Sequence, residues 1–151
     1  DGISAGLFLA CLAAGEHHQG RSLWDRLEDV RDTYGGFRSD QISLRFDSMQ
    51  VAGGVMDRVR EDTATAFPSL TIDSVSDLLH ESGDLPPTNL IQLGLADGDR
   101  VIVRPSGTEP KLKVYLDCVR PQQADADLAL ETLREAVASD IEALVASSST
   151  N

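Results

Sequence analysis

Residues 90–116 read LIQLGLADGDRVIVRPSGTEPKLKVYL, and the rest of the chain is organised around this segment. Two apolar runs, 90–95 and 101–103, flank Ala96-Asp97-Gly98-Asp99. Asp-Gly readily adopts the positive φ values that a tight hairpin turn needs. From Leu112 onward apolar and polar residues alternate, as in a strand with one buried face. The segment therefore predicts antiparallel strands joined by short connections.

A loop rich in hydrogen-bond donors separates the last two of these strands. Its donors are a guanidinium, two hydroxyls and backbone N–H groups, from Arg104, Ser106, Thr108 and Gly107. An arginine offers a planar fork, and a glycine can enter φ > 0 and lets the backbone come close, so the set suits a tetrahedral anion such as phosphate. The residues alone leave an alternative open, in which Pro105 and Gly107 only shape a turn and Arg104 is a solvated charge.

Length, composition and charge limit the classes of protein to which the chain can belong. Its 151 residues are enough for one domain with an appendage and a buried core, and no apolar run is long enough to span a bilayer. The formal net charge of −12 argues against nucleic-acid binding, which needs a Lys/Arg surface. An anion site must therefore be local, and basic residues gather in or beside the loop, at Arg100, Arg104, Lys111, Lys113 and Arg120.

The run Arg104–Lys111, RPSGTEPK, resembles the phosphate-binding loop of the α-D-phosphohexomutases, the phosphoglucomutase and phosphomannomutase family. In that family the motif lies in the C-terminal domain and leads into a strand. The resemblance implies that the loop grips the phosphate that is not being transferred. It implies that Arg104 is a charge-assisted fork and that Ser106 and Thr108 are hydroxyl donors. Gly107 would donate its backbone N–H.

Two further residues of the loop have subsidiary roles. Lys111 is expected to be a second-tier phosphate contact, although it and Lys113 could equally form the solvent face of a strand. Glu109 cannot favour an anion, so it is expected to order the loop, by pairing with Arg104 or by accepting backbone N–H groups. We assign no role to Arg45.

The resemblance also implies a reaction. In the family a phosphoserine transfers its phosphate to C1 or C6 of a hexose phosphate through a hexose 1,6-bisphosphate intermediate. The serine and the aspartates that bind Mg²⁺ belong to earlier domains, so this chain is expected to hold no catalytic residue and no metal site. It would then depend on N-terminal domains of the same polypeptide. The run Lys111-Leu112-Lys113, where glucosamine-phosphate mutases tend to have Leu-Ile-Arg, favours a phosphoglucomutase or phosphomannomutase without choosing between glucose and mannose.

The remaining elements predict an α+β domain over residues 36–147. A strand is expected over 37–47, a helix over 49–60, a strand over 70–75 and a long helix over 122–146. We expect an antiparallel sheet of about four strands with helices on one face. The resemblance makes this fold similar to that of the TATA-box-binding protein. Residues 148–151 are expected to be a frayed tail.

The first 35 residues predict two helices that precede this domain. Asp1 is a suitable N-cap for a well-packed helix, and Ser22 with Asp25 is similar to a capping box for a second helix that ends at Gly35-Gly36, with Trp24 in the core. The opening Asp-Gly-Ile resembles the start of the last helix of the family's third domain, so 1–35 are expected to be the end of that domain and a linker. An ordinary N-terminal helix of a single domain remains the alternative.

Cysteine and histidine positions predict no further chemistry. Cys11 and Cys118 are expected to be buried reduced thiols of a cytoplasmic protein, and the opening residues lack the basic flank of a secretory signal. His17, His18 and His80 have no ligand cluster nearby and are expected to be structural or solvated.

Two other hypotheses remain beside the mutase. The chain could be a stand-alone module that binds phosphorylated ligands, or a structural domain that docks on other subunits through its acidic surface. Arg58 and Arg60, which lie among acidic residues, are expected to form a solvated mixed-charge face.

Overall fold

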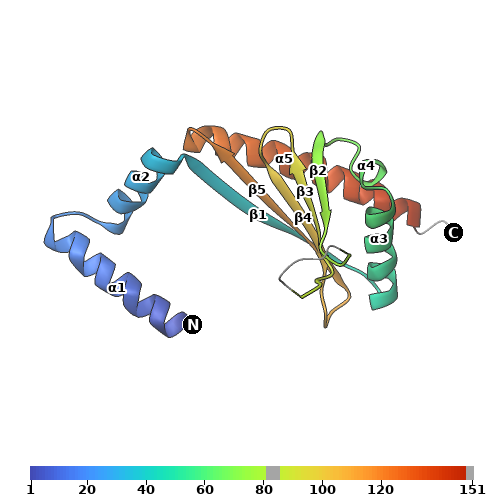
Figure 1. Cartoon of the computed structure of the whole chain (residues 1–151), viewed down its shortest axis with the longest axis horizontal. Helices are drawn as coiled ribbons and strands as arrows, with labels where there is room; N and C mark the ends of the chain where they lie inside the picture. The colour runs from blue at the N-terminus through green and yellow to red at the C-terminus, as the bar shows by residue number, and fades with distance from the viewer. Residues whose placement is uncertain (81–85, 149–151) are drawn as a thin grey trace.

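The computed structural model describes residues 1–80 and 86–148, so the predicted tail lies outside this range except for its first residue. Figure 1 shows two helices extending from a sheet that is backed by helices. In chain order the elements are α1 (Gly2–His18), α2 (Leu23–Tyr34), β1 (Gly36–Arg45), α3 (Met49–Glu61), α4 (Thr63–Ala66), β2 (Ile72–Asp77), β3 (Ile91–Leu95), β4 (Arg100–Pro105), β5 (Lys111–Arg120) and α5 (Gln123–Ser148).

The sheet is antiparallel throughout, with the strand order β1-β5-β4-β3-β2. In the described residues it has five strands, where the sequence predicted about four. Its two edge strands are β1, which precedes α3 in the chain, and β2, which follows it. β1 pairs with β5 along its whole length, from Gly36 opposite Arg120 to Arg45 opposite Lys111. The predicted α+β class is confirmed, and α5 extends to Ser148, one residue into the predicted tail.

One face of the sheet forms a single core with α3 and α5 (Figure 1). Every second residue of the central strands is almost fully buried there, because side chains alternate between the two faces of a strand. Burying each of these aliphatic side chains contributes roughly 1.5–3 kcal/mol. The buried residues of the central strands are Ile91, Leu93, Val101, Val103, Leu112, Val114 and Leu116, and they pack with Val55, Met56, Val59, Leu133, Val137 and Ile141 of the helices.

The turn between β3 and β4 is the predicted Asp-Gly hairpin. Gly98 has φ +80° and donates its N–H to the Leu95 carbonyl at 2.9 Å. The next residue, Asp99, is buried and accepts a hydrogen bond of 2.8 Å from Nη2 of Arg120, which closes this end of the sheet. Burial, followed by the nearby charge of Asp99, raises the pKa of the Cys118 thiol to about 12, so the buried, protonated thiol predicted there fits the structure.

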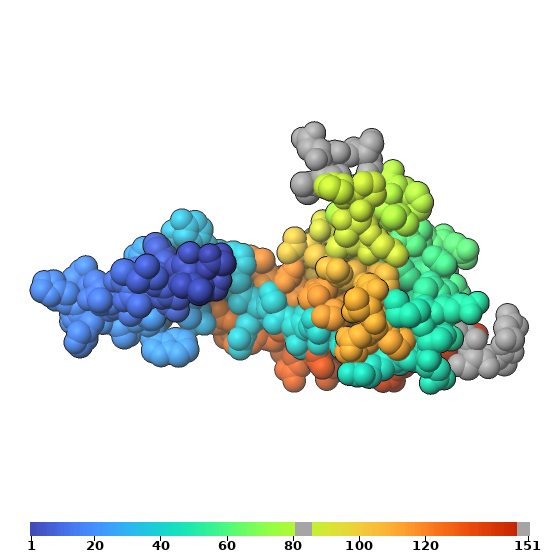
Figure 2. Space-filling model, turned by 90° about the horizontal axis from the view of Figure 1, so that it is seen from below, coloured from blue at the N-terminus to red at the C-terminus, as the bar shows by residue number. Residues whose placement is uncertain are grey.

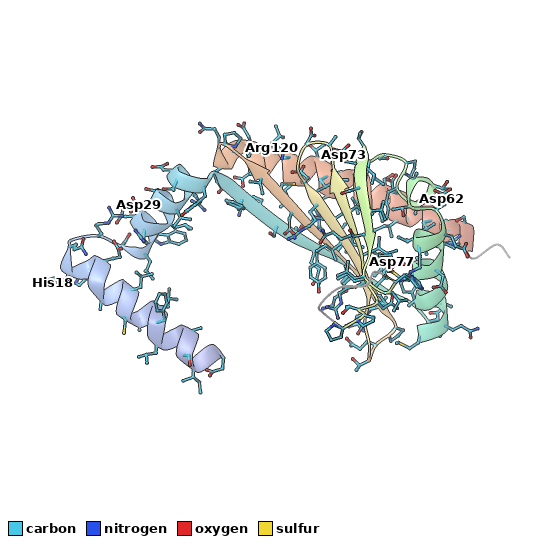
Figure 3. The ribbon with its side chains drawn as sticks, in the orientation of Figure 1. His18, Asp29, Asp62, Asp73, Asp77 and Arg120 are labelled. Carbon is cyan, nitrogen blue, oxygen red and sulfur yellow. The ribbon has the colours of Figure 1, made fainter. Side chains whose placement is uncertain are left out.

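Arg60 is not part of a solvated face. Its side chain is only 16% exposed, because Nε donates to Asp77 at 2.9 Å and Nη2 donates to Asn89 at 2.7 Å. Arg58 likewise donates to the Leu144 carbonyl of α5. Figure 3 shows Asp77 at the end of the sheet that is opposite to Arg120. These arginines tie α3 to its neighbours, which a local charge pattern cannot reveal.

The two N-terminal helices, residues 1–35, form an arm that protrudes from the sheet domain (Figures 1 and 2). Their local signals were predicted correctly: Asp1 accepts the N–H of Ile3 at 2.8 Å, and Ser22 and Asp25 form a reciprocal capping box. Their predicted burial was wrong. Neither helix has a buried residue, Trp24 is 73% exposed, and Cys11 is exposed as well. No part of the described chain lies close enough to cover them.

None of the helices in the described residues is long and apolar enough to cross a membrane.

Candidate functional site

The second face of the sheet carries the predicted loop at one end. The alternation that buries Val103 and Val114 turns Arg104 and Lys113 to the opposite face, where the described chain places no helix (Figure 1). Arg104 is opposite Lys113 in the β4–β5 register. Arg45, at the end of β1, is opposite Lys111. Neighbouring strands are about 5 Å apart, so these basic residues gather on one small area.

Three of these cations have no ion-pair partner among the described residues. Within residues 1–80 and 86–148, no carboxylate lies within 4 Å of the charged atoms of Arg45, Arg104 or Lys113. Elsewhere in the sheet domain arginines are paired, as Arg134 is with Asp40. We call Arg45, Arg104, Lys111 and Lys113 the basic corner. In a chain of net charge −12, it is a local positive area on an acidic background.

The other end of the same face is neutralised. There Arg100 donates to Asp117 at 2.6 Å, and the hydroxyl of Ser39 donates to the same carboxylate at 2.6 Å. Burial raises the pKa of Asp117, but the hydrogen bonds from Ser39 and Arg100 and the charge of Arg100 outweigh it and lower the pKa. The positive potential of this face therefore lies at the loop end.

The loop is closed at its base by backbone hydrogen bonds. The N–H of Ser106 donates to the Lys111 carbonyl at 2.8 Å, and the N–H of Phe46 donates to the Pro110 carbonyl at 2.8 Å. The loop is thus attached both to its own strands and to the end of β1. A loop held in this way fixes where its donors lie.

Within the loop, two backbone N–H groups donate to the same hydroxyl oxygen, that of Ser106. Oγ of Ser106 lies 3.4 Å from the backbone N of Thr108 and 3.3 Å from that of Glu109, and it accepts both N–H groups. Gly107 does not use the positive φ that a glycine can adopt, since the described glycines with positive φ do not include it. A Cβ at Gly107 would meet nothing within 4 Å. The turn itself therefore does not require a glycine there.

Glu109 pairs with Lys111 and not with Arg104. Nζ of Lys111 donates to Oε2 of Glu109 at 2.8 Å, and the lysine side chain is only 14% exposed. This hydrogen bond and the Lys111 charge, with smaller contributions from Arg45 and Lys113, lower the pKa of the Glu109 carboxyl group. The expectation that Glu109 orders the loop agrees with this contact, but Lys111 was not among the partners that the sequence suggested, which were Arg104 and backbone N–H groups.

The structure places the predicted site residues on one loop and adds others. Arg104 is the second-to-last residue of β4 and lies on the open face, two residues before Ser106, and Gly107 and Thr108 follow at the exposed tip. Sequence reasoning missed Arg45, which comes from a strand about sixty residues earlier. The alternation of β1 placed it on an exposed face, but only the β1–β5 register brings it to the loop.

No metal centre accompanies this loop in the part of the chain that the structure describes. There, no group of three or more His, Cys, Asp or Glu side chains is placed to hold a metal ion. The described residues do not fit the magnesium site that the family resemblance implies for the whole enzyme.

Fold and loop together define an α+β domain that presents a basic, donor-rich hairpin loop at one end of an open sheet face. Residues 71–135 match the family model of the phosphoglucomutase/phosphomannomutase C-terminal domain. The chain is 32% identical over 137 residues to a probable phosphomannomutase of Haemophilus influenzae, and 31% identical over 120 residues to a phosphoglucomutase of Staphylococcus epidermidis. The chain belongs to the phosphoglucomutase/phosphomannomutase family, whose C-terminal domain it contains.

Similarity to a solved structure supports the fold. The open form of pp63/parafusin, a phosphoglucomutase from Paramecium, superposes with a TM-score of 0.69 at 16% sequence identity, over 94% of this chain and 27% of that one. The Haemophilus alignment covers 91% of this chain and the Staphylococcus alignment 69%. The chain spans only 28% and 21% of the length of these two relatives.

Proposed function

We propose that the loop at residues 104–111 binds the phosphate group of a hexose phosphate that is not being transferred, as the C-terminal part of a phosphohexomutase. The observation that supports this most is the basic corner, in a strongly acidic chain. Three of its cations have no carboxylate partner within residues 1–80 and 86–148, and they lie beside a loop of hydroxyl and N–H donors. Arginine and lysine without a carboxylate partner are free to pair with an anionic ligand.

Each donor has a distinct part in this proposal. Arg104 supplies a charge-assisted fork, and Ser106 and Thr108 supply hydroxyl donors. Gly107 supplies an N–H that a ligand can approach closely, which gives a reason for a glycine where the turn itself needs none. Lys111 remains a second-tier contact. Each direct charged contact contributes roughly 1.5–3 kcal/mol.

The chemistry of transfer belongs to the whole polypeptide in this proposal. The enzyme would be an isomerase that moves phosphate within a hexose phosphate, with hexose 1,6-bisphosphate as intermediate, in the cytoplasm. Its reactive serine and its Mg²⁺ would come from domains that precede this segment. The loop would hold the substrate by its other end and fix its orientation for transfer.

The arm is proposed to belong to the preceding domain. Helix α1 is apolar all round, with Ile3 87% exposed and no residue buried. A helix that is apolar on every side is normally enclosed by other protein. Residues 1–35 would then be the end of that domain and a linker, and residues 36–147 the phosphate-binding domain.

Titration of the ¹⁵N-labelled 151-residue chain with hexose 1,6-bisphosphate tests the proposal, with amide chemical shifts as the readout. We expect a dissociation constant on the order of 1 mM, no turnover, and at least roughly tenfold weaker binding by Arg104→Ala. Arg134→Ala is the matched control, because it removes an exposed arginine from the helix side of the sheet. Gly107→Ala should weaken binding without changing the melting temperature.

Other outcomes would favour the competing functions. Submicromolar binding by this chain alone would favour a stand-alone phospholigand module. Binding that Arg104→Ala leaves unchanged would place the ligand elsewhere and contradict the proposed loop. Failure of a longer polypeptide, with its preceding domains, to bind the bisphosphate would favour a structural role.

A further inference from the structure

The loop carries an acidic residue in the middle of its basic corner. The backbone carbonyl of Glu109 accepts the N–H of Lys111 at 2.7 Å, and its carboxylate accepts a hydrogen bond of 2.8 Å from the Lys111 ammonium. Both contacts are made with Lys111, two residues further along the chain. A carboxylate at this position opposes the binding of any anion, so its presence in an anion-binding loop needs a physical reason.

The loop pairs some of its own donors internally. Oγ of Ser106 accepts the N–H groups of Thr108 and Glu109, and the Glu109 carboxylate neutralises Lys111. A hydroxyl oxygen and a carboxylate oxygen thus occupy donors that a phosphate oxygen could also use. The hydrogen bond and the charge of Lys111, with smaller contributions from Arg45 and Lys113, lower the pKa of this carboxylate, so it is ionised at neutral pH.

We propose that Glu109 is a built-in counter-ion which weakens and thereby tunes the grip of the loop on phosphate. This inference rests on the proposed phosphate-binding function. An arriving dianion pairs with the Lys111 ammonium that Glu109 holds, and the carboxylate pairs with it again when the ligand leaves. Because binding exchanges one anion for another, the loop releases phosphate more easily than an unopposed cluster of cations would. Glu109 is in this sense a positioning residue that acts through Lys111.

The direction in which one substitution changes the affinity for phosphate separates this role from a structural one. Inorganic phosphate is titrated into the 151-residue chain, and dissociation constants are taken from the amide shifts of the loop. Glu109→Gln should bind phosphate roughly two- to fivefold more tightly, the size of effect expected for an exposed ion pair. If Glu109 only ordered the loop, the same change would weaken binding.

The matched control is Glu135→Gln, which removes the same charge from an exposed position on α5. It should leave the dissociation constant within the error of the wild type, and an equal gain there would assign the effect to net charge and overturn the proposal. Glu109→Asp keeps the charge and should bind close to wild type. Weaker binding by Glu109→Gln, or an unchanged constant, would also overturn the proposal.

A double variant tests whether the effect passes through the lysine. In a Lys111→Met background there is no ammonium for Glu109 to hold, so Glu109→Gln should gain less than it does in the wild type. An equal gain in affinity in both backgrounds would overturn the proposal that Glu109 acts through Lys111. If the wild type binds no phosphate, or Arg104→Ala binds as well as wild type, the proposed function itself fails. If those two behave as proposed and Glu109→Gln does not tighten binding, only the counter-ion role fails.

Discussion

The arm and the sheet domain follow the same local rules but differ in what covers their apolar side chains. Both helices of the arm have side-chain N-caps, and neither has a buried residue. In the sheet domain, strands with ordinary alternation bury a continuous core against α3 and α5. Local signals therefore determine where a helix begins, whereas burial depends on a partner surface. Figure 2 shows the arm standing apart from the domain.

The largest expected effect compares one leucine from each region. Leu116→Ala, in the fully buried centre of β5, should lower the free energy of unfolding by about 2–5 kcal/mol through lost burial and a cavity. Leu7→Ala, in exposed α1, should change it by less than about 0.5 kcal/mol. Urea unfolding of the 151-residue chain measures both. Equal costs would show that α1 is packed in solution and would remove the distinction between the regions.

The same leucine pair sharpens the domain proposal. In a longer polypeptide that includes the preceding domain, Leu7→Ala should become destabilising by a core-like amount, because α1 would then be covered.

Two glycine substitutions, one in each region, should have smaller effects on stability, and the two effects should be opposite in sign. A Cβ at buried Gly36, the first residue of β1, would lie 2.5 Å from the Cα of Gln123, so Gly36→Ala should cost about 1–3 kcal/mol. Gly6, inside α1, has nothing within 4 Å of such a Cβ, and Gly6→Ala should stabilise its helix by about 0.5–1 kcal/mol. Thermal unfolding reports the first change, and circular dichroism at 222 nm the second. A loss of helix signal in Gly6→Ala would contradict the exposed arm.

The smallest expected effect is the acid response of the sheet domain. The folded-state pKa of Asp117 is lowered, so the unfolded chain binds more protons there, and the stabilisation is present above about pH 4 and lost as the pH falls through the folded pKa. Asp117→Asn should cost less than about 1 kcal/mol at pH 7 and make the loss of stability on acidification shallower. Unfolding free energies at pH 7, 5, 4 and 3 measure this. A steeper acid loss in the variant would reverse the assigned sign.

The loop illustrates how far sequence reasoning reaches. The order of Arg104, Ser106, Gly107 and Thr108 predicted an anion-binding loop between two strands, and the structure has those residues in a closed hairpin loop. Glu109 and Lys111 lie two residues apart, yet the sequence suggested Arg104 or backbone N–H groups as partners of Glu109, because several donors are within reach of a flexible glutamate. Only the folded loop decides among such partners.

Which distant residues come together in the fold could not be predicted from the sequence, for a different reason. Arg45 received no role, although it belongs to the basic corner, because strand register and order across β1, β5 and β4 bring it there. Arg60 and Trp24 were misjudged in opposite directions. A charged face was expected to be solvated and is tied to Asp77, and an aromatic residue was expected in a core and is exposed.

The sequence by itself determined the helix starts, the hairpin turn at Gly98, the alternation of the strands and the donor set of the loop, since each depends on residues within a few positions of one another. The tertiary structure alone decided which cations meet, which charges are neutralised and which apolar faces are covered. Those properties depend on the register of distant strands and on the surface that packs against each element, and neither is encoded in any short stretch of the chain.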